Sequence, residues 1–128
     1  MNRSGDWFKQ AERDLAHARN ACADADFEWA AFAAQQAAEK AVKALILSRN
    51  GAPWGHSVLA LLDALEEHAL LPDAPIEAAS RLDKHYIPSR YPDGVPAGYP
   101  GRLYTRGEAE AAVSDGSTVV EWCRGHLA

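Results

Sequence analysis

The sequence predicts an all-α protein, an up-and-down bundle of four to five helices with a long loop rich in Pro, Gly and Tyr before the last helix. Three observations support this prediction. Long stretches consist of strong helix formers, apolar residues recur at spacings of three and four, and the short connections between these stretches favour antiparallel neighbours. No strand pattern and no repeat is found, and 128 residues suffice for one domain, 1–128, with its own core.

The first helix is expected to begin near Ser4, a good N-cap, with Asp6 in its first turn, where the helix dipole favours negative charge. Residues 23–26 predict a tight break after it, with Asp24 or Asp26 capping the next helix. One apolar stripe is expected along the first helix, formed by Trp7, Ala11, Leu15, Ala18 and Cys22.

The second helix, from about Asp26 to Arg49, is the longest, and Asn50-Gly51 should end it because both residues tolerate the left-handed conformation. Its alanines allow close approach of neighbouring helices. A polar ridge also runs along it at three- and four-residue spacing, formed by Gln36, Glu39, Lys40 and Lys43. This ridge is either a solvent face or the wall of a site.

Residues 52–55 predict a turn, after which His56 and Ser57 open a third helix. A fourth helix, with Pro75 tolerated in its first turn, must end at Pro88. The third helix is expected to bury Val58, Leu61, Leu62, Leu65 and Ala69, and the fourth Ile76, Ala79, Leu82 and Tyr86.

Residues 87–105 contain four prolines and three glycines, which we interpret as forbidding regular structure, and three tyrosines that argue against disorder. We expect a loop packed on the bundle. The last helix should begin near Thr105, which forms a capping box with Glu108. Its inner face includes Gly116, where we expect a close helix crossing.

The net charge of −5 argues against a protein that binds DNA by bulk positive charge. No apolar run is long enough for a membrane span and no signal-peptide pattern is present, so a cytoplasmic location is expected. Cys22 and Cys123 lack metal-ligand spacing and are interpreted as free, half-buried thiols. No metal site is predicted. The third helix carries one ridge of potential metal ligands, which is typical of a solvated face: Asp63, Glu66, Glu67 and His68.

Several of these residues together resemble one known family. The second helix contains Ala-x-x-Gln-Gln-Ala-x-Glu-Lys-Ala-x-Lys-Ala-Leu and is followed by a Gly and by His56 opening a leucine-rich helix. Further on, Leu82-Asp83-x-x-Tyr86 leads into Ile87-Pro88-Ser89-Arg90-Tyr91-Pro92-Asp93, and the final helix carries Val120-Glu121-Trp122. In this order, over nearly the whole chain, the pattern resembles the HEPN family (higher eukaryote and prokaryote nucleotide-binding), in its branch with the Ile-Pro-Ser-Arg-Tyr-Pro-Asp loop.

The resemblance implies a helical bundle that is commonly a homodimer and is often encoded beside a small nucleotidyltransferase, including toxin–antitoxin pairs. Some family members are metal-independent ribonucleases with an Arg-x4–6-His motif at the start of the last helix. This chain departs from that motif, because no histidine follows Arg102 or Arg106 at the required spacing. The ribonuclease activity is therefore the disfavoured alternative.

Four residues are candidates for holding a phosphate or nucleotide: Lys40, Lys43, His56 and Arg90. His56 is also the one candidate for catalysis, as a general base. The alternatives are structural. Glu39 pairs with Lys43 on a solvated face, Arg90 forms a salt bridge to Glu39 or another helix carboxylate, and His56 satisfies nearby backbone groups. We expect the loop to be anchored by Glu39, Tyr86, Ser89, Tyr91 and Asp93, with Tyr86 in the core and its hydroxyl hydrogen-bonded.

We therefore predict a nucleotide-binding or interaction component that works with a separately encoded nucleotidyltransferase. The expected partners are a second copy of the chain, the nucleotidyltransferase, and a nucleotide or RNA, and the only cofactor considered is a nucleotide. The remaining alternative is a purely structural interaction subunit.

Overall fold

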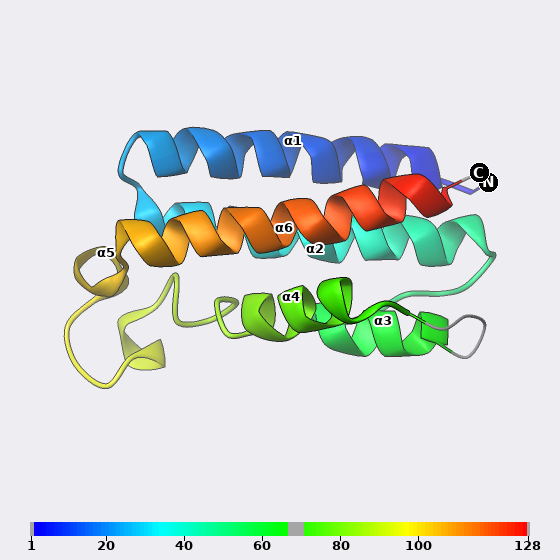
Figure 1. Ribbon diagram of the computed structural model, residues 1–128. Coiled ribbons are helices and arrows are strands. Elements are labelled where there is room, and N and C mark those ends of the chain that lie inside the picture. The colour runs from blue at the N-terminus through cyan, green and yellow to red at the C-terminus, as the bar shows by residue number, and fades with distance from the viewer. Residues whose placement is uncertain (1, 67–70, 128) are drawn as a thin grey trace.

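The computed structural model describes residues 2–66 and 71–127, and within these ranges every regular element is helical. The predicted all-α, up-and-down architecture is confirmed (Figure 1). The elements are α1 (Ser4–Ala23), α2 (Phe27–Ser48), α3 (Val58–Glu66), α4 (Asp73–Asp83), the 3₁₀ helix η1 (Pro92–Gly94), α5 (Pro100–Leu103) and α6 (Arg106–His126).

Helix α1 begins at Ser4, with Asp6 in its first turn as expected, but Arg3 rather than Ser4 holds the N-cap position. The predicted stripe is partly wrong. Trp7 and Cys22 are only half-buried, and Phe8 and Ala21 take their places in the buried face. Phe8 and Ala21 lie three residues from Ala11 and Ala18 respectively, so both fit the same helical spacing as the three predicted residues that are buried.

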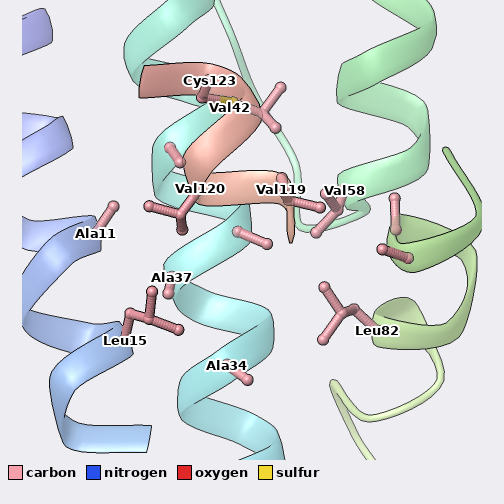
Figure 2. Packing of buried hydrophobic residues seen from close by; sticks show 14 of the residues in the cluster. Ala11, Leu15, Ala34, Ala37, Val42, Val58, Leu82, Val119, Val120 and Cys123 are labelled. Carbon is pink, nitrogen blue, oxygen red and sulfur yellow. The ribbon is translucent and has the colours of Figure 1, made fainter. Parts of the chain in front are cut away.

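Helix α2 lies at the centre of the molecule and packs against α1, α6, α3 and α4. Its alanines permit this. A Cβ on Gly116 of α6 would lie 3.0 Å from the Ala34 carbonyl oxygen, so the expected close crossing is confirmed. Figure 2 shows the buried side chains of α2 between those of α1 on one side and those of α4 and α6 on the others. Because every side of α2 has a neighbour, little of it is left for solvent.

The connection from α2 to α3 follows the prediction closely. Asn50 has a φ of 61°, in the left-handed region, and Ser57 is the N-cap of α3, with its hydroxyl accepting from the Ala60 N–H at 3.0 Å. The helix therefore begins at Val58 instead of His56. Of the predicted third-helix residues, Glu67, His68 and Ala69 lie outside the described residues.

Two expectations for the later chain are corrected. Helix α4 already ends at Asp83, so Tyr86 lies in the turn that follows and is half-buried rather than in the core. The loop is not wholly irregular either, because Pro92 and Pro100 each open a short helix, a position at which proline is tolerated. Thr105 is the N-cap of α6 and accepts from the Glu108 N–H at 3.2 Å, as predicted.

Both cysteines are free thiols, as expected, but only Cys22 is half-buried. Cys123 lies in the core, where burial raises the pKa of its thiol to about 12. Among the described helices, none combines the length and the apolar character that crossing a membrane requires.

Candidate functional site

The polar ridge of α2 is largely buried. Glu39 is 3% exposed and Lys43 8% exposed, and the Lys43 ammonium lies 3.2 Å from a Glu39 carboxylate oxygen. The expected Glu39–Lys43 pair is therefore present, but its expected setting on a solvated face is wrong. The reason is that α2 has neighbours on all sides, so even its polar positions face other elements.

Glutamine side chains connect this ion pair to the turn before α3. Gln35, which is fully buried, donates to the His56 carbonyl at 2.9 Å and accepts from the Gln36 side chain at 2.7 Å. No buried side-chain nitrogen or oxygen in the described part of the chain lacks a partner. The buried polar atoms of the network formed by Gln35, Gln36, Glu39, Lys43 and His56 are therefore all satisfied, which is the condition for a stable buried polar cluster.

His56 lies where this network reaches the surface. Its Nδ1 is 3.2 Å from a Glu39 carboxylate oxygen, and its ring stacks on Tyr86 with centroids 4.7 Å apart and an interplanar angle of 16°. The side chain is nevertheless 58% exposed. Because Nδ1 faces Glu39, Nε2 is the nitrogen open to a ligand.

Arg90 lies over three aromatic rings. Its guanidinium carbon is 4.4 Å from the Phe32 centroid, 4.8 Å from that of Tyr86 and 4.9 Å from that of Tyr91. Its Nε donates to the Tyr86 carbonyl at 2.9 Å. The expected salt bridge to Glu39 is absent, and no other carboxylate within residues 2–66 and 71–127 pairs with Arg90, so its terminal NH₂ groups are available to an anion.

We name Phe32, His56, Tyr86, Arg90 and Tyr91 the aromatic–arginine cluster. It gathers residues from α2, from the turn before α3 and from the turns after α4. Beside it, a hollow of about 610 Å³ is lined by His56 together with Pro53, Trp54, Ala60, Leu61 and neighbouring residues. His56 therefore joins the cluster to the hollow.

The remaining predicted loop residues differ in their surroundings. Ser89 is buried, and its hydroxyl donates to the His85 carbonyl. Asp93 is exposed in η1. Tyr91 is exposed apart from its contact with Arg90. For the Tyr86 hydroxyl, the described residues provide no hydrogen-bond partner, in contrast to the expectation.

Lys40 is not brought together with His56 and Arg90. Its ammonium forms an ion pair with Asp14 of α1, in which the side chains are only 25% and 17% exposed. The structure thus separates the two lysines of the ridge. Lys43 belongs to the network beneath His56, and Lys40 ties α2 to α1.

Asp83, the last residue of α4, has a structural role that the sequence pattern does not predict. Its carboxylate accepts from the Val58 N–H at 2.7 Å, from the Leu59 N–H at 3.1 Å and from the Ser57 hydroxyl at 2.7 Å. An acidic residue at the end of one helix thus caps the start of another. No local pattern could reveal this, because the partners are about 25 positions apart.

A second missed contact closes the base of the loop. His85 Nδ1 lies 2.8 Å from the Tyr104 hydroxyl. Burial lowers the pKa of His85 and raises the pKa of Tyr104 to about 12. The pair holds the residue two positions after α4 close to the residue two positions before α6.

The chain is similar to known proteins over almost its whole length. The family model described as "HEPN domain" matches residues 4–126. TT1696 from Thermus thermophilus has a crystal structure with 48% sequence identity and a TM-score of 0.95, and the match covers 99% of this chain and 100% of that one. The search of the curated proteins found no match.

Two further crystal structures are similar over almost the whole chain. ST0689, an archaeal HEPN homologue, has 39% identity and a TM-score of 0.85, with 100% of both chains covered. An HEPN domain protein (tm0613) from Thermotoga maritima has 34% identity and a TM-score of 0.79, with 95% of this chain and 97% of that one covered.

Proposed function

Because this chain belongs to the HEPN domain family, we propose that it is a nucleotide-binding and interaction component that works with a separately encoded nucleotidyltransferase, as in a toxin–antitoxin-type pair. We assign it to the family branch with the Ile87–Asp93 loop. The observation that carries the nucleotide-binding proposal is the placement of Arg90, which lies on aromatic rings beside an exposed imidazole and has no carboxylate partner in the described chain.

Arg90 and His56 would hold the phosphate. A guanidinium presents a fork of N–H donors that matches phosphate oxygens, and hydrogen bonds to a charged group are the stronger ones. Arg90 keeps its terminal NH₂ groups for this role because only its Nε is used within the chain. Both side chains contact the Tyr86 ring, which places the guanidinium and the imidazole in the same cluster.

The base would stack on an aromatic surface beside them. The hollow next to His56 falls within the volume range of small-molecule sites. Trp54, which lines it, is 88% exposed and offers an indole face. Base–aromatic stacking contributes about 1–3 kcal/mol per base in single-stranded nucleic-acid complexes, enough for a useful part of the affinity.

In this proposal neither Lys40 nor Lys43 contacts the phosphate. Both ammonium groups already have a carboxylate partner, Asp14 or Glu39. A phosphate that recruited either lysine would have to compete with that partner. We therefore expect Lys43 to hold the Glu39 carboxylate in place, and Glu39 in turn to orient the His56 ring.

Exposed aromatic side chains support an interaction role for the same protein. Trp29 extends the cluster through an edge contact with Phe32 at 6.0 Å and is half exposed, and Trp54 is almost fully exposed. Tryptophan, tyrosine and arginine are the residues that dominate binding energy at protein interfaces. We propose that this surface takes part in contact with a second copy or with the nucleotidyltransferase, and light scattering on purified protein tests the homodimer.

The nucleotide proposal is tested by calorimetric titration with ATP, GTP and a short RNA. We expect micromolar binding of a nucleotide by the wild type and a loss of about 10- to 100-fold in Arg90→Gln, which removes a charge-assisted contact. Arg102→Gln is the matched control, because Arg102 is an exposed arginine on α5 outside the cluster. Lys40→Gln should bind like the wild type.

Two outcomes would change the proposal. The absence of heat with every ligand would leave the protein–protein interaction role and remove the nucleotide site. RNA cleavage without metal, lost in His56→Ala, would favour the ribonuclease alternative, in which the exposed imidazole on Glu39 acts as general base.

A further inference from the structure

We propose that Asp83 is a positioning residue that fixes His56 and Arg90 in a single arrangement, by fastening the turn before α3 to the turn after α4. The inference rests on the proposed function in so far as these two side chains bind the ligand. The carboxylate itself is expected to stay off the ligand, because three donors from residues 57–59 already occupy it.

The start of α3 is capped twice. Ser57 already caps this helix through the Ala60 N–H. Asp83 adds a second acceptor, from another helix, that takes the first two N–H groups and the Ser57 hydroxyl. Since Ser57 directly follows His56 in the chain, this double cap fixes the backbone from which the imidazole projects.

The turn after α4 connects Asp83 to both proposed ligand-binding side chains. Tyr86 follows Asp83 by three residues, and its N–H approaches the Asp83 carbonyl at 3.4 Å. Its ring stacks on His56, while its carbonyl accepts from Arg90 Nε. The buried Ser89 fastens the same turn through the His85 carbonyl.

Together these contacts form a closed circuit. It runs from the His56 ring through the backbone to Ser57, across to the Asp83 carboxylate, along the chain to Tyr86, and back to the His56 ring by stacking. Arg90 is attached to the circuit at Tyr86. If the Asp83 link is removed, α3 still packs on α4, but among the described residues no side-chain hydrogen bond then joins residues 57–59 to residues 83–90. The imidazole and guanidinium then lose their fixed relative placement.

The test compares Asp83→Ala and Asp83→Asn with Asp115→Asn. Asp115 is a suitable control because it is also an aspartate bonded to a different helix, through two contacts with Arg81 of α4 at 2.9 Å. One readout is the NMR signal of the His56 ring protons, which the stacked Tyr86 ring shifts. The other is the affinity for ATP, and circular dichroism verifies folding.

We expect Asp83→Ala to move the His56 ring signals toward those of an unstacked histidine and to weaken ATP binding about tenfold. Asp83→Asn keeps one acceptor oxygen and should lie between the wild type and Asp83→Ala. Asp115→Asn should lower stability without altering either readout. If Asp83→Ala does not fold, Asp83→Asn and Ser57→Ala provide the same comparison.

An unchanged His56 signal in a folded Asp83 variant would overturn the inference and leave Asp83 as a helix cap alone. This outcome is distinct from failure of the proposed function. If the wild type binds no nucleotide, the affinity readout disappears, but the His56 signal still decides whether Asp83 positions the ring.

Discussion

Replacing Lys43 with methionine tests whether the polar ridge of α2 is a buried ionic network. Methionine keeps most of the apolar length of the side chain and removes the ammonium group that lies 3.2 Å from Glu39. Glu39, at 3% exposed, would then be a buried carboxylate whose neighbours are Gln35, Gln36 and His56. Removing one partner of a buried ion pair typically costs about 3–5 kcal/mol.

We expect the lower end of this range, about 3 kcal/mol, because two amides and an imidazole still face the Glu39 carboxylate. For a chain of this length that loss lowers the midpoint of thermal unfolding by about 10 °C. Lys40→Met is the matched control. Its ion pair with Asp14 is more exposed, so we expect a loss of about 1 kcal/mol or less.

Thermal and urea unfolding of both variants, followed by circular dichroism, provides the measurement. A double variant, Glu39→Gln with Lys43→Met, should recover more than half of the lost stability, because it leaves no unpaired charge in the interior. If Lys43→Met costs no more than Lys40→Met, the network contributes nothing beyond a surface ion pair and the reasoning is wrong.

Two further predictions concern packing and pH. Gly116→Ala should destabilise the protein by about 1 kcal/mol, because overpacking against the Ala34 backbone outweighs the gain in helix propensity, whereas Gly125→Ala on the same helix has open space and should be neutral or slightly stabilising. Equal midpoints of unfolding in the two variants would contradict a close crossing. For His85, burial lowers the pKa in the folded state, so the unfolded chain binds more protons below pH 6.5 and stability falls as the pH drops below that value. His85→Gln should lose this component of the pH dependence, and parallel wild-type and variant curves between pH 7.5 and 5 would rule it out.

The helices could be predicted from sequence because their signals are local. Thr105 with Glu108, Asn50 with Gly51, and Ser57 each specify a helix end through bonds within a few residues. The sequence predicts a longer α4, because the apolar spacing continues to Tyr86 and Pro88 is the first residue that must end it, but the helix ends at Asp83. The spacing of apolar residues along the chain does not by itself determine where a helix ends.

The site was harder to predict, for physical reasons that differ between residues. The composition of the ridge suggested exposure, but burial of Glu39 and Lys43 depends on how many neighbours α2 has, which its own sequence does not state. For Arg90 the sequence predicts either a phosphate contact or a salt bridge to a helix carboxylate, and the salt bridge is absent among the described residues. Arg90 lies over aromatic rings, while the Glu39 carboxylate faces Lys43 and His56, and neither arrangement has a local sequence signal.

The central position of α2 also bears on how the chain is made. Helices α1 and α2 are adjacent in sequence and can pair as soon as both have been synthesised. The face of α2 that receives α6, where Gly116 meets Ala34, has no cover until residues 106–126 have left the ribosome. During that interval the nascent chain exposes the alanine-rich apolar surface around Ala34 that α6 covers in the finished fold.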